Sequence, residues 1–288
     1  MNPKNFLIID GNSIVHRAYH ALPPLTAPDG QIVNAIYGFL MIFLKAVKDF
    51  SPGYMAACFD FPAKTFRHEK YVDYKATRVK APQELYDQIP QTKRILKEMG
   101  VAVFERQRYE ADDLIATIAK KSPDLDKIIV SGDMDNAQLI DEHTKLFGWA
   151  KKIKDTVIYD RQKVFEHFGV YPEQVVDYKA LVGDASDNIP GAKGIGPKTA
   201  VELLQNYKTV KALLDALETD QAWDLNEKIK SRILENKEKI LLSYDLATAN
   251  FQALDDFDVL TCKFNGFDKE KTAQIFNEYG FRSLLDRV

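Results

Sequence analysis

Cysteine is scarce in this sequence: Cys58 and Cys262 are the only two among 288 residues. Neither lies in a CxxC pair or in a Cys/His spacing that would bind zinc, which excludes a cysteine-held zinc module and a disulfide-stapled secreted fold. Cys58 also lies inside an apolar, strand-like run. The low cysteine content therefore favours a reducing, cytoplasmic location.

Long apolar segments are also missing. No apolar run reaches the roughly 18 residues that a membrane helix requires. Residues 1–6 contain no apolar core typical of a secretion signal. These absences predict a protein without a membrane segment and without an export signal.

The sequence has no large excess of either charge, since its formal net charge is −3. An evenly basic nucleic-acid-binding protein is excluded, but a local basic surface next to an acidic pocket is not. The length of 288 residues exceeds that of most single domains. We therefore expect one large α/β unit or a main domain with a smaller attachment.

Short β-like runs alternate with helical patterns over the first half of the chain. Strands are expected near 6–10, 54–60, 101–104, 127–130 and 145–150, and helices near 34–48, 84–98 and 110–120. Such alternation is typical of a mostly parallel sheet flanked by helices. From about residue 161 the sequence becomes helical and polar. We expect a core over residues 1–170 and a helical subdomain over residues 171–288.

Acidic residues stand at the ends of apolar runs that are far apart in the sequence. In a parallel sheet, ligands bind beyond the carboxyl ends of the strands. Each acid alone is compatible with ordinary turn or helix-cap chemistry, but the joint pattern predicts one shared acidic site. Nine residues form the pattern: Asp10, Asp60, Glu110, Asp112, Asp113, Asp133, Asp135, Asp184 and Asp187.

Carboxylates gathered in one place need a cation, because like charges raise each other's pKa unless they are neutralised. Oxygen ligands prefer Mg²⁺ or Mn²⁺ over Zn²⁺. The pattern therefore predicts a site for Mg²⁺, for which Mn²⁺ can substitute, and chemistry on phosphate groups.

A basic segment follows Asp60 directly. Residues 64–80 read KTFRHEKYVDYKATRVK, with aromatic residues among the lysines and arginines and no tidy apolar face. A solvated loop or helix is the plain interpretation of such a charged run. Its position beside the acidic cluster instead predicts a basic lid that binds phosphates and stacks Phe66, Tyr71 or Tyr74 on bases.

A glycine-rich turn precedes a helix at residues 191–204, which read GAKGIGPKTAVELL. Gly194 and Gly196 allow a tight turn, and the proline that follows suits the first position of a helix whose free N–H groups can hold a phosphate. The turn lacks Walker A spacing, and a plain connection between two helices is the alternative. Lys193 and Lys198 favour the phosphate interpretation.

The stretch IVHRAYH at residues 14–20 follows Asp10. His16 or His20 could ligate a metal ion, but neither has a partner at metal spacing, so we expect surface packing or contact with nucleic acid. Arg17, which lies between them, is expected to contact DNA.

These motifs resemble the 5′-nuclease (flap endonuclease) family, and in particular the 5′→3′ exonuclease domain of bacterial DNA polymerase I. The resemblance rests on FLIIDGNSIVHRAYHA, YEADDLIATIA, GDMDNAQL and LVGDASDNIPGAKGIGPKTA, and it covers nearly the whole chain. It implies a PIN-like α/β nuclease core, a helical arch over the active site and a C-terminal helix–three-turn–helix element that binds duplex. The segment FRSLLDRV is similar to the point where that domain stops before the next polymerase domain.

The resemblance also implies roles for individual residues. Asp10, Asp60, Glu110 and Asp112 match a first metal group, and Asp133, Asp135, Asp184 and Asp187 match a second, with Asp113 nearby. Lys75 and Arg78 match residues that contact the scissile phosphate. The residues expected to contact DNA are Arg17, Tyr74, Lys193, Gly194, Gly196, Lys198 and Thr199, and a K⁺ ion is a further candidate at that turn. Met134 departs from the family, which often has lysine there.

We therefore expect a divalent-metal-dependent 5′ nuclease that cleaves branched or 5′-flap duplex DNA and RNA-primer/DNA junctions in replication and repair. It would act as a monomer, alone or fused to a polymerase. A non-catalytic DNA-binding module of the same fold is the alternative from another class. A metal-dependent phosphatase would leave the basic lid and the glycine-rich turn unexplained.

Overall fold

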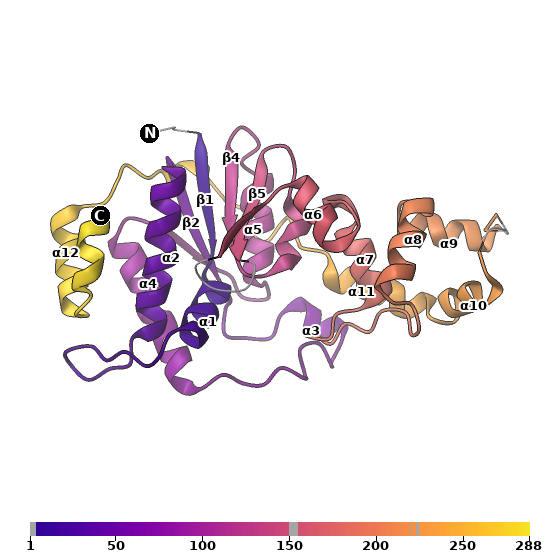
Figure 1. The fold of residues 1–288 in the computed structure, drawn as a ribbon, viewed down its shortest axis with the longest axis horizontal. Helices are drawn as coiled ribbons and strands as arrows, with labels where there is room; N and C mark the ends of the chain where they lie inside the picture. The colour runs from indigo at the N-terminus through magenta and orange to yellow at the C-terminus, as the bar shows by residue number, and fades with distance from the viewer. Residues whose placement is uncertain (1–3, 150–154, 220, 223–224) are drawn as a thin grey trace.

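The computed structural model describes residues 4–149, 155–219, 221–222 and 225–288. Its centre is a six-stranded sheet with the order β3-β2-β1-β4-β5-β6 (Figure 1). The parallel strands are β1 Asn5–Asp10, β2 Tyr54–Phe59, β3 Ala102–Glu105, β4 Asp126–Val130 and β5 Thr144–Trp149. The expected mostly parallel sheet is confirmed.

The edge strand β6, Thr156–Tyr159, pairs antiparallel with β5 and was not predicted from the sequence. Its sequence, TVIY, neither alternates strictly between apolar and polar residues nor forms a fully apolar run, so the pattern does not mark it as a strand. The last residue of the strand expected at 145–150, Ala150, lies outside the described residues.

The central strands are apolar on both faces, because helices cover the sheet on both sides. In β1, Leu7 and Ile9 belong to a core cluster with residues of α2 Asn34–Phe50 and α4 Gln83–Glu98. Phe6 and Ile8 belong to a second cluster with residues of α5 Ala111–Lys120. Alternation of the side chains along the strand thus builds one core on each face of the sheet.

The strand order changes direction between the neighbouring strands β1 and β4. After β1 the chain continues to β2 on one side, and after β4 it continues to β5 on the other side. β1 leads into α1, Gly11–Ala21, and β4 leads into the short 3₁₀ helix η1, Met134–Leu139. Gly11 is needed at this point, since a Cβ there would lie 2.3 Å from the Phe59 ring. In open parallel sheets, the crevice at such a reversal is the usual place for a ligand.

The chain after β6 forms a helical region at one end of the molecule (Figure 1). Its elements are α6 Arg161–Phe168, η2 Pro172–Gln174, α7 Val175–Val182, α8 Pro197–Tyr207, α9 Val210–Glu218, α10 Glu227–Glu235 and α11 Lys237–Ala247. They share an apolar cluster that includes the buried side chains of Leu181, Leu204, Leu213 and Ile240. Within the described residues, no helix combines the length and apolar character that crossing a membrane requires.

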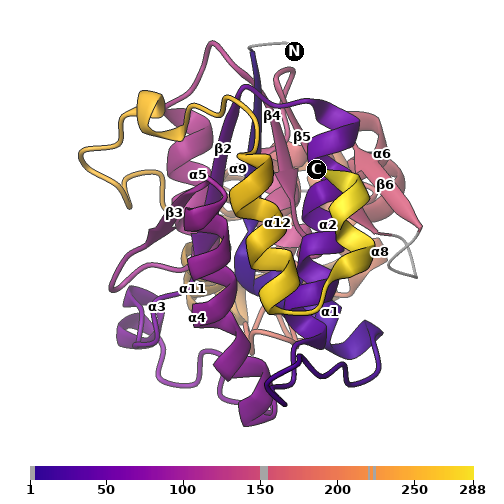
Figure 2. The same ribbon diagram turned by 90° about the vertical axis from the view of Figure 1, so that its left-hand side faces the viewer.

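The C-terminal residues return to the sheet. The 3₁₀ helix η3, Val259–Cys262, lies beside β2, and α12, Lys269–Glu278, packs against α4 (Figure 2). Phe281 lies just before the last 3₁₀ helix η4, Arg282–Arg287. Its ring makes a T-shaped contact with the ring of Tyr37 of α2, and the two ring centres are 5.3 Å apart. These residues complete the core cluster that contains Leu7 and Ile9. The division of the chain into two domains at residue 170 stays a prediction.

The basic segment after β2 contains one short helix, α3 Phe66–Lys70, and then turns that lead to α4. Arg67 anchors this helix: its guanidinium donates two hydrogen bonds of 2.8 Å to Asp113 of α5. It also donates to the carbonyl oxygens of Leu246, in the last turn of α11, and of Thr248, just after this helix, at 2.8 and 3.0 Å. The Arg67–Asp113 pair is almost wholly buried. It therefore fixes three separate parts of the chain against one another.

Replacing Arg67 by methionine should lower the free energy of unfolding by about 3 kcal/mol, because it leaves the Asp113 carboxylate buried without its cation. Arg106→Met removes an exposed arginine whose partner Asp255 is also exposed, and should cost less than about 1 kcal/mol. Urea unfolding of both variants checks this. Equal stability of Arg67→Met and wild type would show that the buried pair does not hold the fold.

Candidate active site

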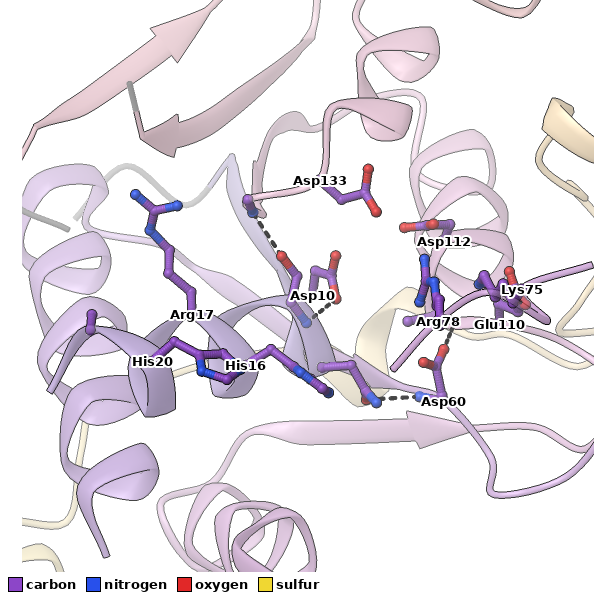
Figure 3. A pocket seen from close by; sticks show the side chains of 15 residues that line it. Asp10, His16, Arg17, His20, Asp60, Lys75, Arg78, Glu110, Asp112 and Asp133 are labelled. Atoms are coloured by element: carbon purple, nitrogen blue, oxygen red, sulfur yellow. Dashed lines mark hydrogen bonds and ion pairs between the residues drawn. The ribbon is translucent and has the colours of Figure 1, made fainter. Parts of the chain in front are cut away.

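A cleft of about 1080 Å³ opens at the carboxyl ends of β1, β2 and β4. Acidic, basic and imidazole side chains from α1, the basic segment, α5 and the loop after β4 point into it (Figure 3). The charged and imidazole residues that line it are Asp10, His16, Arg17, His20, Asp60, Lys75, Arg78, Glu110, Asp112 and Asp133. The structure therefore brings together five of the nine acids that the sequence pattern singled out.

Asp10 and Asp60 are held by hydrogen bonds from neighbouring elements. Asp10 ends β1 and caps α1, accepting from the Ser13 N–H at 3.0 Å and from the Ser131 hydroxyl at 2.6 Å. Asp60 follows β2 and accepts from the Ala111 N–H at 2.8 Å, at the start of α5. Each carboxylate thus ties a strand end to the first turn of a helix.

Glu110 and Asp112 enter the cleft from the N-terminus of α5, where the helix dipole favours negative charge. Glu110 is the N-cap residue, and its carboxylate lies 2.9 Å from Lys75 Nζ. Asp112 accepts a hydrogen bond of 2.8 Å from the side-chain amide of Asn136 in η1. Asn136 was not among the predicted site residues, although it lies in the same motif as Asp133 and Asp135.

Electrostatics in this first group favour the neutral acid at Asp10, Asp60 and Asp112. Burial raises the pKa of Asp10 to about 7, with further contributions from Asp133 and Asp60, despite opposing hydrogen bonds. Burial and the neighbouring carboxylates Asp133, Asp10 and Asp135 raise the pKa of Asp112 well above its usual range. Burial also raises the pKa of Asp60. The protein's own cations therefore do not fully compensate these carboxylates.

Three of the four remaining acids, Asp135, Asp184 and Asp187, form a second group that is paired with basic side chains. Lys179 of α7 contacts both Asp135, through a short hydrogen bond, and Asp184, at 2.7 Å. Burial raises the pKa of Asp135 to about 7, helped by Asp133 and opposed by Lys179. Burial acts the same way on Asp184, but Lys179 and Ser186 outweigh it and lower the pKa of Asp184 to about 2. Lys179 was missed because nothing in its sequence context separates it from a solvated helical lysine.

The basic segment reaches this acidic region through Lys75 and Arg78. The backbone N–H of Lys75, a residue with φ of 57°, donates to the Asp187 carbonyl at 2.9 Å. Arg78 makes a short ion pair with the Asp187 carboxylate. Burial raises the pKa of Asp187, but Lys75 and Arg78 outweigh this effect and lower it. The two basic residues thus lie among the carboxylates, as the sequence predicted.

Two predicted site residues, Asp113 and Tyr74, are buried and make contacts other than those predicted. Asp113 points away from the cleft, is fully buried, and accepts from Arg67 and from the backbone N–H groups of Glu110 and Asn250. Tyr74 is 3 % exposed, and its hydroxyl lies 3.1 Å from both Glu110 and Asp187. A buried ring cannot stack on a base, so Tyr74 orders the acidic residues instead.

Arg17 lies in the wall of the cleft. Its guanidinium sits 4.8 Å from the centre of the Trp149 ring, an attractive cation–π geometry. Its Nε is buried without a hydrogen-bond partner among the described residues. Burial also lowers the pKa of Arg17.

The glycine-rich turn forms the start of α8, away from the cleft-lining residues. Gly194 has φ of 86°, and its carbonyl oxygen accepts a hydrogen bond of 2.8 Å from Arg232. Gly196 caps α8 with φ of −98°, so its backbone does not require glycine, and a Cβ there would meet nothing within 4 Å. No side chain caps this helix, which leaves its first N–H groups exposed to a ligand between Lys193 and Lys198.

The first group fits a hard divalent cation. All its donors are carboxylate oxygens, and the raised pKa values of Asp10 and Asp112 reflect a deficit of positive charge. Within the described ranges, no three Asp, Glu, His or Cys side chains are placed closely enough to hold one metal ion together. Lys75, Arg78 and Lys179 each contact at least one of the predicted acids instead.

Family models match almost the whole chain. Residues 5–169 match the 5′-3′ exonuclease N-terminal resolvase-like domain, and residues 170–270 match the 5′-3′ exonuclease C-terminal SAM fold. The chain is similar to the "5'-3' exonuclease" of Aquifex aeolicus, with 39% identity over 99% of this chain and 95% of the relative. It is also 38% identical to DNA polymerase I of Bacillus subtilis over 99% of this chain, but it spans only 32% of that protein.

Solved structures show the same fold at lower identity. The bacteriophage T5 5′-exonuclease with bound zinc ions has a TM-score of 0.72 and 21% identity, over 96% of this chain and 99% of that one. The catalytic core of Rad2 in complex with DNA has a TM-score of 0.59 and 16% identity, over 99% of this chain and 93% of that one. The family models and the relatives together show that this chain belongs to the 5′-3′ exonuclease family.

Proposed function

We propose that this chain is a divalent-metal-dependent nuclease that hydrolyses DNA phosphodiesters from a 5′ end and at 5′ flaps. One observation carries the proposal: acids from β1, β2, α5 and the loop after β4 meet in a single cleft with a deficit of positive charge, beneath two basic side chains. Membership of the 5′-3′ exonuclease family supports the same activity.

The proposed metal ligands fall into two groups, which differ from the two groups described above in that Asp133 is assigned to the second. Asp10, Asp60, Glu110 and Asp112 would hold a first ion, and Asp133, Asp135, Asp184 and Asp187 a second, while Asp113 is left out because it pairs with Arg67. Bound Mg²⁺, or Mn²⁺ in its place, would lower the pKa of an attacking water and stabilise charge on the phosphate. Relatives support this, since T5 structures contain divalent metal ions.

The chain's own basic residues are suited to the phosphate. Lys75 Nζ lies 2.9 Å from Glu110, and Arg78 is half exposed where it contacts Asp187. When a scissile phosphate enters the cleft, both cations can turn from these carboxylates to its oxygens. There they stabilise the negative charge that develops in the transition state.

The turn before α8 is proposed to hold a duplex phosphate through the N–H groups of Lys198 and Thr199 and the charge of Lys193 and Lys198. A K⁺ ion at this turn stays a prediction, and it would compete there with Arg232 for the Gly194 carbonyl. Duplex affinity over a salt series tests the phosphate contact, which weakens as salt rises.

The biological setting is proposed from the relatives. Several are named DNA polymerase I, which supports removal of flaps and RNA primers during replication and repair. Action in the cytoplasm as a monomer, alone or joined to a polymerase, stays a prediction. A non-catalytic DNA-binding module would leave the charge deficit of the acidic cleft without a purpose.

Asp133→Asn should reduce cleavage of a 5′-flap duplex in Mg²⁺ by at least about 100-fold, the scale of losing one electrostatic contribution to a transition state. Duplex affinity should hold or improve, because less negative charge faces the phosphates. Asp256→Asn changes an exposed residue outside the cleft and is the control. Near wild-type cleavage by Asp133→Asn would refute the assigned metal group.

Lys75→Ala should lower the single-turnover cleavage rate about 100-fold, with less than about a threefold change in duplex affinity, because its charge acts where the transition state develops. Lys70→Ala removes an exposed lysine of the same segment, which pairs with Asp245, and should leave both quantities unchanged. Equal losses of rate and affinity in Lys75→Ala would reduce Lys75 to an ordinary DNA contact.

A further inference from the structure

Lys179 has an unusual position for a lysine. It lies on α7, its side chain is 10% exposed, and its Nζ contacts two carboxylates at once. One is Asp135, through a short hydrogen bond, and the other is Asp184, at 2.7 Å. A lysine that is nearly buried needs such partners, since burying an unpaired ammonium group is costly.

The two carboxylates that Lys179 joins come from different parts of the fold. Asp135 belongs to η1, directly after β4 of the sheet. Asp184 lies in the turn after α7, which is closed by backbone hydrogen bonds of 2.9 and 2.8 Å between Asp184 and Ile189. Gly183 shapes this turn with φ of 81°, and a Cβ there would lie 2.6 Å from the Ile189 carbonyl oxygen. Lys179 therefore links the sheet to the helical region through their acidic residues.

The residue between the paired aspartates adds a second observation. That residue is Met134, which carries no charge. Its side chain packs, partly buried, against the apolar cluster on the α5 face of the sheet. In this chain, the positive charge beside Asp135 thus comes from α7.

We propose that Lys179 is the built-in counterion of the second acidic group. It holds Asp135 and Asp184 together while no divalent ion is bound, and it competes with that ion for the same carboxylates. Its charge repels an incoming cation at close range, so binding must displace the ammonium group. Lys179 is a positioning residue in this account, which rests on the proposed metal-dependent function.

The test compares Lys179→Met with Lys163→Met, in which an exposed lysine of a surface ion pair is removed with the same change in charge. Titration with Mn²⁺, with the free ion followed by electron paramagnetic resonance, gives the number and affinity of bound ions. We expect the more weakly bound Mn²⁺ ion to bind about tenfold more tightly to Lys179→Met than to wild type, because the repelling charge of the ammonium group is gone. Lys163→Met and Lys179→Arg should bind as wild type does.

Thermal unfolding supplies a second readout that does not depend on cleavage activity. In EDTA, Lys179→Met should melt at a lower temperature than wild type, since two half-buried carboxylates lose their cation, and Mn²⁺ should remove the difference. Should the variant fail to fold in EDTA, the double variant Asp135→Asn/Lys179→Met is expected to fold. Failure of that double variant too would assign Lys179 to packing and overturn the proposal.

The outcomes separate this proposal from the proposed function. Wild type that binds Mn²⁺ while Lys179→Met gains no affinity would overturn the counterion role alone, and flap cleavage would stand. Absence of Mn²⁺ binding by both proteins would refute the counterion role together with the metal-dependent function.

Discussion

Burial of carboxylates close to one another is the constraint on which this structure depends. Burial, together with repulsion from neighbouring carboxylates, raises the pKa values of Asp10, Asp112 and Asp135. The fold meets part of this cost with basic side chains from two segments: Lys75 and Arg78 from the segment after β2, and Lys179 from α7. The part that remains uncompensated is the physical basis for expecting divalent cations.

The topology of the sheet brings these elements together around the cleft. The carboxyl ends of parallel strands meet at one edge of the sheet, and the reversal of strand order between β1 and β4 opens a crevice there. The basic segment after β2 is held by the pair of Arg67 and Asp113, away from the cleft. One acid of the YEADDL motif thus serves stability while its neighbours Glu110 and Asp112 face the site.

Much of this arrangement was predictable from the sequence. Apolar runs that end in aspartate placed Asp10, Asp60 and Asp133 at one sheet edge, and periodicity located α2, α4 and α5. Pairing between distant residues was not predictable. Nothing local shows that Asp113 turns inward to Arg67, that Tyr74 is buried, or that Lys179 bridges Asp135 and Asp184, because these contacts arise only in tertiary packing. The return of α12 to the first core was missed for the same reason.

Thermal unfolding as a function of pH, in EDTA and in Mg²⁺, tests the central claim most directly. Asp10 and Asp135 have pKa values of about 7 when folded, against 3.8 as their ordinary value. Their neutral forms therefore contribute stability that is fully present below about pH 4 and is lost as pH rises through about 7. Asp184, with a pKa of about 2, changes its contribution only at lower pH. We predict that stability in EDTA falls from pH 5 to about 8 and that Mg²⁺ largely removes this fall. Identical pH profiles with and without Mg²⁺ would contradict the account.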